Sequence, residues 1–229
     1  VNPRSIGYHA PMDPRDDLLQ TSAPRPQGPR WAWPTWLPVR TLRARHREQV
    51  LTHLLALDAV DRHRRFGQAA TDEQIARYVA HIDFGRDEVF GVFDTRLRLL
   101  ALAHLAYGAE PDSAEFGVSV LPRGRGRGLG RRLFELAALH ARNRGAHTLV
   151  IHLARDNAPM LAIVRHSGAT VAYEGGGDAV ARLRLPDSDL ASHLGALAER
   201  RAAELDYRLK RDWLRWRAWL VRRPGPQNP

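Results

Sequence analysis

Glycine and arginine alternate in one stretch of the sequence, L-P-R-G-R-G-R-G-L-G-R-R-L, at residues 121–133. A glycine-rich turn in front of a helix can bind an anion, because the first N–H groups of a helix lack intrahelical partners and the helix dipole is positive there. Glycine also lets a phosphate approach the backbone without a Cβ in the way. The alternatives are a flexible basic segment that binds nucleic acid and a solvated turn without a ligand. A strand that ends at Pro122 and an apolar helical pattern from Leu129 favour the structured loop.

Three glycine motifs that bind phosphate groups can be compared with this stretch. The P-loop motif requires Lys and then Ser or Thr after its last glycine, and no glycine here is followed in this way. The dinucleotide motif G-x-G-x-x-G fails because Leu129 or Arg131 stands in place of its third glycine. A third motif, [Q/R]-x-x-G-x-[G/A] between a strand and a helix, fits residues 125–130.

This third motif is typical of the GNAT N-acetyltransferases, and residues 117–169 resemble the acetyl-CoA-binding core of that family. The resemblance includes a V-x-P sequence that ends at Pro122, and Asn157 with Gly168 eleven residues later. It implies a mixed α/β fold, with a GNAT-like central mixed sheet that is splayed at the acetyl-CoA site and flanked by helices.

Two upstream segments sharpen the resemblance. Residues 55–67, L-A-L-D-A-V-D-R-H-R-R-F-G, and the pair Ala114-Glu115 resemble the branch that contains bacterial protein lysine acetyltransferases. The similarity extends over residues 38–186.

The resemblance implies that acetyl-CoA is the co-substrate and indicates which residues hold it. The backbone of Val118, Ser119 and Val120 would pair with the pantetheine arm as if the arm were an added strand. Backbone N–H groups at the helix start would bind the pyrophosphate, and arginine side chains would add positive charge. The rest of the predicted cofactor-binding set is Arg125, Gly126, Arg127, Gly128, Leu129, Gly130, Arg131 and Asn157.

Acetyl transfer to an amine needs a base for the amine and a proton for the departing thiolate. By resemblance, Glu115 stands where lysine-acetylating members carry a catalytic glutamate, and the alternative is an ordinary residue of a surface strand. Val164 occupies the position at which many members have a tyrosine acid, so the general acid stays open. Ser167, His166 and Tyr173 are nearby, without a distinguishing spacing.

The remaining polar residues indicate little about a metal or about the acceptor. No histidine pair has metal-binding spacing, so no metal is predicted. The first helices and the closing strands are expected to build the acceptor site. Their polar residues do not indicate which class of amine binds there, and they are Arg62, His63, Arg65, Glu88 and Asp178.

The hydrophobic pattern predicts the elements that must position these residues. A capping box at Thr71 and Gln74 marks one helix start, and Gly145 ends the long helix after the glycine loop. The expected strands are 39–42, 88–93, 97–107, 113–121, 148–153, 170–174 and 179–185, and the expected helices are 45–57, 71–81, 129–144 and 157–166.

The predicted core domain, residues 37–186, has an extension on each side. Residues 1–36 are rich in proline and are predicted to be an extended arm. Residues 187–229 are predicted to be an amphipathic helix and tail, with seven basic residues and three tryptophans between 208 and 223. Packing on the domain or in a homodimer is favoured for this helix over a membrane surface or a nucleic acid.

Bulk composition narrows the class of protein. The formal charge is +10, but Lys210 is the only lysine and the arginines are spread through the chain, which disfavours a dedicated nucleic-acid binder. The absence of cysteine and of a signal pattern predicts a cytoplasmic location. We therefore predict an acetyl-CoA-dependent N-acetyltransferase that acts on a primary amine, such as a protein lysine. The alternative is a regulatory or interaction protein on a GNAT scaffold, with acyl-CoA sensed or absent.

Overall fold

The computed structural model describes residues 38–108, 112–174 and 177–186, together with 207, 208, 210–212 and 214. The predicted arm and most of the predicted C-terminal extension lie outside the described residues. The strands are β1 (Val39–Leu42), β2 (Glu88–Phe93), β3 (Leu99–Tyr107), β4 (Ser113–Val120), β5 (Thr148–Ala154), β6 (Thr170–Tyr173) and β7 (Asp178–Arg184). The α-helices are α1 (Arg47–Leu55), α2 (Ala59–Phe66), α3 (Asp72–His81), α4 (Leu129–Asn143) and α5 (Ala158–His166).

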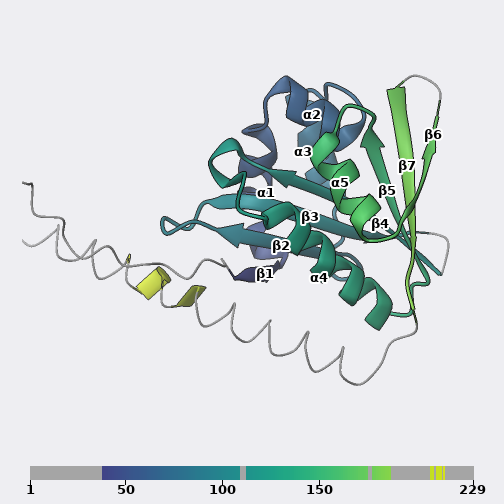
Figure 1. Cartoon of the computed structure of the whole chain (residues 1–229). Coiled ribbons are helices and arrows are strands. Elements are labelled where there is room, and N and C mark those ends of the chain that lie inside the picture. Colours follow the sequence, from purple (N-terminus) through teal and green to yellow (C-terminus); the bar gives the residue numbers. More distant parts are fainter. Residues whose placement is uncertain are drawn as a thin grey trace, which may run out of the picture. The chain divides into compact units, whose positions relative to one another are not determined.

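The strands form one mixed sheet in the order β1-β2-β3-β4-β5-β7-β6 (Figure 1). Neighbouring strands are antiparallel except β4 and β5, which run parallel. This parallel pair has only three residue pairs, from Ser113 with Thr148 to Glu115 with Val150. Beyond Glu115 the two strands part, and the predicted splayed mixed sheet is confirmed.

Helices cover both faces of the sheet, with α4 and α5 in front of it in Figure 1. Leu133, Phe134 and Ala137 of α4 repeat at helical spacing, and all three are buried against the strands. On the other face, α1 and α3 bury Val50, Leu54, Ile75 and Val79 in a second core. Alternate residues of β3 and β4 point to opposite faces, so one face of β4 carries core residues and the other is free for polar groups.

Helix α2 is the main element that the sequence pattern failed to predict. The sequence pattern predicts a first helix over 45–57 and then no helix before 71, whereas α1 ends at Leu55 and α2 follows. Helix α2 has only eight residues, of which Ala59, Val60 and Phe66 are apolar and none is buried, so it is too short for its apolar pattern to be recognised. Its cap residues are typical of helix ends and could have indicated it. The Asp58 side chain accepts the N–H of Asp61 at 2.8 Å, and Gly67 ends the helix at φ 73°. The predicted capping box of α3, Thr71 with Gln74, is confirmed.

A short part of the C-terminal extension is described, and it packs on the core domain. The centroid of the Tyr207 ring lies 5.3 Å from that of the Phe93 ring, and the Arg40 guanidinium lies 3.5 Å from the Tyr207 centroid. These contacts favour the packing alternative for this part of the helix. Among the described residues, no helix has the length and apolar character needed to span a membrane.

Candidate functional site

The glycine loop forms a backbone cradle at the start of α4. Gly126 and Gly128 both have φ +70°, a left-handed conformation that glycine adopts without a steric penalty. The N–H of Arg132 donates to the carbonyl of Gly128 at 3.0 Å, so α-helical geometry provides no acceptor for the preceding N–H groups. The first turn contains no acidic residue, and its positive end is therefore suited to an anion.

A first cavity of about 430 Å³ lies between this loop, the edge of β4, α2 and α5. It is lined by every predicted cofactor-binding residue except Arg127, which is exposed and outside its lining. The predicted residues in its wall are Val118, Ser119, Val120, Arg125, Gly126, Gly128, Leu129, Gly130, Arg131 and Asn157.

The walls of this cavity suit an extended ligand with an apolar part. Residues 116–120 of β4 have no partners on β5, so their backbone groups on that side are available to an extended ligand. Helix α5 presents Pro159, Met160 and Ile163 to the same space, which suits an apolar arm. The Asn157 side chain accepts the N–H of Met160 at 3.3 Å and so caps the helix that carries these residues.

A second cavity, also about 430 Å³, begins where β4 and β5 part. Glu115 is exposed on β4 and lines it, together with Tyr78, His152, Glu174 and Asp178. The predicted base is therefore in a different cavity from the glycine loop. Of the polar residues expected around the acceptor, Arg65 and Asp178 line this cavity, whereas Arg62, His63 and Glu88 do not.

Arg65 connects the two cavities, because it lines both. Its guanidinium lies against Gly117, where an added Cβ would be 2.5 Å from the Arg65 Cζ. Gly117 stands between Glu115 and Ser119 on one face of β4. The arginine thus fills the gap that the missing side chain leaves, and places a positive charge where the cavities meet.

Comparison with known proteins agrees with this geometry. The sequence model of the Acetyltransferase (GNAT) family matches residues 30–168, more than half of the sequence. The chain belongs to the GNAT acetyltransferase family. The predicted family and fold are confirmed, and membership makes acetyl-CoA the co-substrate.

Several individual proteins are similar to this GNAT chain. A mycothiol acetyltransferase of Catenulispora acidiphila is 34% identical over 67 residues, which span 29% of this chain and 21% of that relative. The GNAT domain of S. lividans PAT has a TM-score of 0.54 at 19% identity, covering 64% of this chain and 89% of that one. Spermidine N-acetyltransferase from Vibrio cholerae, solved with CoA and spermine, has a TM-score of 0.51 at 20% identity, covering 65% and 95%. At these identities the structural matches show the shared fold.

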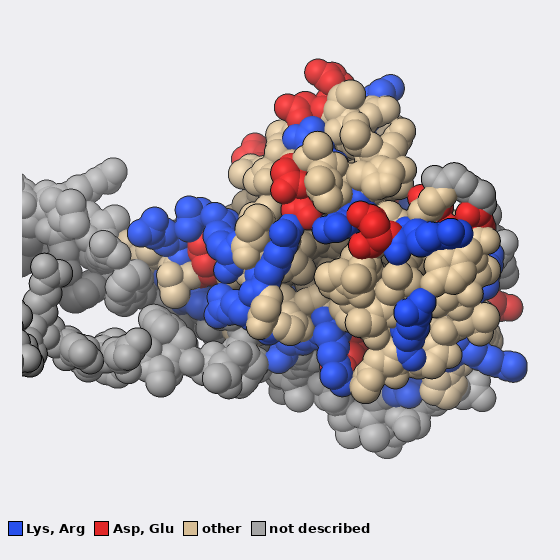
Figure 2. Space-filling model, turned by 45° about the horizontal axis from the view of Figure 1, so that its top comes forward, with Lys and Arg blue, Asp and Glu red and all other residues tan. Residues whose placement is uncertain are grey.

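Two arginines of the glycine loop, Arg125 and Arg131, are paired with acids in this structure. Arg125 forms an ion pair with Asp61 of α2, and Arg131 Nε lies 2.7 Å from a carboxylate oxygen of Glu135. Figure 2 shows the same tendency over one face of the molecule, where acidic side chains lie between the basic ones. Pairing reduces the charge that these side chains offer a phosphate, which leaves the backbone N–H groups as the main anion-binding feature.

The structure provides no acid at the position where many GNAT members have a tyrosine. Val164 is fully buried in the core, and the α5 side chains in the first cavity carry no transferable proton. The Ser167 hydroxyl donates to the Val164 carbonyl at 2.7 Å, and Arg165 donates to the Tyr173 oxygen at 2.7 Å. None of the three nearby candidates, Ser167, His166 and Tyr173, lines either of the two cavities.

Ser119 has a buried partner on the side of β4 that faces α1. Its hydroxyl lies 2.9 Å from His53 Nε2, and His53 Nδ1 lies 3.3 Å from the Leu99 carbonyl. Burial, together with the nearby Arg123 and Arg65 charges, lowers the pKa of His53 from 6.5 to about 4. His53 is therefore neutral at neutral pH, with Nδ1–H donating to the carbonyl and Nε2 accepting from Ser119. This bond fixes one residue of the predicted pantetheine-binding strand.

The described residues contain no group of three His, Cys, Asp or Glu side chains arranged to hold a metal ion.

Proposed function

We propose that this chain transfers the acetyl group of acetyl-CoA to a primary amine by direct attack of the amine on the thioester. Acetyl-CoA supplies an acyl group that is already activated as a thioester. The observation that carries the proposal is the unpaired edge of β4, which has Glu115 at one end and the glycine loop beyond the other. A ligand held along this edge would present its thioester near the junction of the two cavities.

In this proposal Glu115 acts as the general base, directly or through a water molecule. An exposed carboxylate in the second cavity can bind the ammonium form of the acceptor and take one of its protons. Glu174 and Asp178 add negative charge to the same wall, which supports an acceptor carried on a cationic group. We propose a protein lysine as this acceptor, in line with the resemblance of residues 55–67 and 114–115 to lysine-acetylating members.

The first test is acetyl-CoA binding by calorimetry, followed by turnover with lysine peptides, polyamines and simple alkylamines. Glu115→Gln should lower kcat by about 100-fold at neutral pH, a loss typical of a removed general base, with acetyl-CoA affinity unchanged. Glu174→Gln is the matched control and should act mainly on the KM of the acceptor. No binding at millimolar acetyl-CoA would exclude the proposal, and full activity of Glu115→Gln would remove that residue from the mechanism.

A second candidate function is an acyl-CoA-binding regulatory protein. The buried Val164 and the absence of a proton donor among the α5 residues in the first cavity favour it. It differs in one measurable result, which is acetyl-CoA binding without acetylated product from any amine in the panel.

A further inference from the structure

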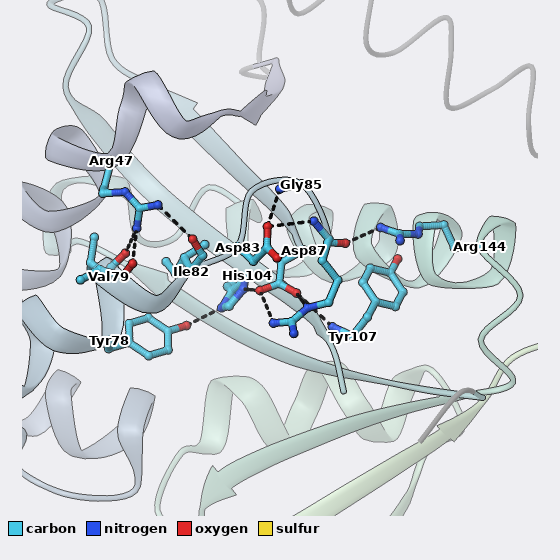
Figure 3. A network of polar contacts seen from close by, with 12 residues as sticks. Arg47, Tyr78, Val79, Ile82, Asp83, Gly85, Asp87, His104, Tyr107 and Arg144 are labelled. Carbon is cyan, nitrogen blue, oxygen red and sulfur yellow. Dashed lines mark hydrogen bonds and ion pairs between the residues drawn. The ribbon is translucent and has the colours of Figure 1, made fainter. Parts of the chain in front are cut away.

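Behind the second cavity, Tyr78, His104 and Asp87 form a continuous hydrogen-bonded row. Tyr78 Oη lies 2.6 Å from His104 Nδ1, and His104 Nε2 lies 3.1 Å from Asp87 Oδ2. Figure 3 shows the three side chains in line, from α3 across β3 to the residue before β2. Arg65 Nη2 donates to Tyr78 Oη at 2.6 Å, so the row begins at the arginine that lies between the two cavities.

The direction of every proton in the row follows from its two ends. Arginine can only donate, so Tyr78 Oη accepts from Arg65. The ionised Asp87 carboxylate can only accept, so His104 Nε2–H donates to it. In the neutral ring the other nitrogen, Nδ1, carries a lone pair and accepts the hydroxyl proton of Tyr78. His104 is thus a neutral imidazole whose free nitrogen faces a tyrosine.

The charges around the row keep this arrangement at neutral pH. Burial lowers the pKa of His104, and the Arg65 charge lowers it further, while Asp87 and Glu115 act in the opposite direction. Burial would raise the pKa of Asp87, but hydrogen bonds from Arg86 and His104 bring it below its usual range. The row therefore rests as a neutral histidine between a tyrosine hydroxyl and an ionised aspartate.

The row also connects two openings. Tyr78 lines the second cavity, where Glu115 lies. Tyr78, His104 and Asp87 together line a third cavity of about 430 Å³, whose wall also contains Arg77, His81 and Arg86. A proton that enters at Tyr78 can leave to water at the other side of the row.

Acetylation of an ammonium provides a proton that such a row could carry. The acceptor nitrogen loses two protons as it becomes an amide, one of which ends on the thiol sulfur and one in water. In the proposed function Glu115 takes one of these protons and passes it, directly or through water, to the thiolate sulfur. The other has no assigned acceptor.

We infer that Tyr78 is a catalytic residue that takes this proton, and that His104 and Asp87 act through it; the inference rests on the proposed function. An N–H bond of the acceptor breaks and an O–H bond forms at Tyr78 Oη, as the original hydroxyl proton of Tyr78 moves to His104 Nδ1. The resulting imidazolium is stabilised by the Asp87 carboxylate at 3.1 Å. It returns to neutral by giving its proton to water at the third cavity.

Tyr78→Phe tests this role in the full chain, because it removes the oxygen and keeps the ring. We expect kcat to fall by about 100-fold, with acetyl-CoA affinity unchanged and acceptor KM within about threefold. The fall should be smaller for fluorinated alkylamines than for unsubstituted amines of similar size, because a more acidic ammonium needs less help from a base. A purely structural role of Tyr78 would lower the rates of both amines equally.

His104→Gln is the second variant, since glutamine can still accept a hydrogen bond but cannot carry the proton. It should show the same dependence on the amine, and a thermal melt shows whether each variant is folded. Tyr107→Phe is the matched control, because Tyr107 is partly buried on β3 and lines neither of the first two cavities. An unchanged kcat in Tyr78→Phe, or an equal loss for both amines, would overturn the inference and leave the proposed function standing. Absence of turnover by the wild-type chain would overturn both.

Discussion

Gly117→Ala should reduce activity without unfolding the protein, because it moves Arg65 and little else. Gly117 has an extended backbone in β4, so alanine introduces no backbone strain. The new Cβ would lie 2.5 Å from Arg65 Cζ and Nη1, whereas non-bonded carbon atoms rest at about 3.5–4.0 Å. The guanidinium must therefore shift by about 1 Å.

The size of the effect follows from this shift. Moving Arg65 Nη2 by that distance from its 2.6 Å contact with Tyr78 Oη takes the pair out of hydrogen-bonding range. A hydrogen bond to a charged group contributes about 1.5–3 kcal/mol, and partial exposure of Arg65 reduces this. Alanine is favoured over glycine in a strand by about 0.5–1 kcal/mol, which offsets part of the loss. Net stability should change by about 1 kcal/mol or less, so Tm should stay within about 4 °C.

Turnover should change more than stability does. We expect kcat to fall by about 10-fold to 100-fold, which corresponds to about 1.4–2.7 kcal/mol of lost transition-state stabilisation. The measurements are kcat, acceptor KM, acetyl-CoA affinity and Tm for Gly117→Ala, Arg65→Lys and the double variant. Because both substitutions remove the same contact, the double variant should be no slower than the slower single variant. Additive losses in kcat, or full activity with the Arg65–Tyr78 contact intact in a crystal structure, would refute this reasoning.

Three further predictions concern stability and co-substrate binding. Gly128→Ala should lower Tm by about 2–4 °C, because alanine in a left-handed conformation costs about 1 kcal/mol, and it should also weaken acetyl-CoA binding. Gly145→Ala is the control, since Gly145 also has a positive φ but does not line the first cavity, and it should lower only Tm. Asp61→Asn should tighten acetyl-CoA binding by about threefold at low salt, because it frees Arg125 and removes a negative charge from the first cavity, and calorimetry should show the gain shrinking as salt rises. His53→Gln should abolish much of the loss of stability on acidification, as urea unfolding at two pH values would show.

The sign for His53 follows from its lowered pKa. Between about pH 6.5 and pH 4 the unfolded chain binds a proton at this histidine and the folded chain does not, so stability falls as pH falls. The wild-type free energy of unfolding should therefore decrease by about 2 kcal/mol from about pH 8 to about pH 5 because of this residue. An equal decrease in His53→Gln would assign the effect to other groups. The Asp61→Asn prediction has its own control in Asp72→Asn. Asp72 pairs with Arg62 at 2.7 Å and does not line the first cavity, so this substitution should leave acetyl-CoA binding unchanged.

Most of the sheet and the conformation of the glycine loop were predictable from local sequence patterns. The strands bury alternate or continuous apolar runs, and α4 buries one stripe, so period and turn residues locate them within a few positions. The glycine loop was predictable because its function depends on backbone conformation, and glycine at 126 and 128 reports the left-handed backbone directly.

Helix α2 shows why other parts of the fold and of the candidate site were harder to predict. It has only eight residues and buries none of them, which is too short a stretch for its apolar pattern to stand out, yet it contributes Asp61 and Arg65 to the cavities. Its cap residues Asp58 and Gly67 mark its two ends in the sequence. The pairing of Arg125 with Asp61 joins residues 64 positions apart, and no spacing rule relates them.

The sequence by itself determined the family, the position of the glycine loop and the strand that carries Glu115. These features are local, since each depends on the conformation or burial of a few consecutive residues. Only the tertiary structure decided that Glu115 and the loop open into separate cavities, that Arg65 lies between them, and that Tyr78, His104 and Asp87 form one row. Those three residues come from a helix, a strand and a loop. The packing of α3 against the sheet brings Tyr78 within 2.6 Å of His104, and the pairing of β2 with β3 brings Asp87 within 3.1 Å of it.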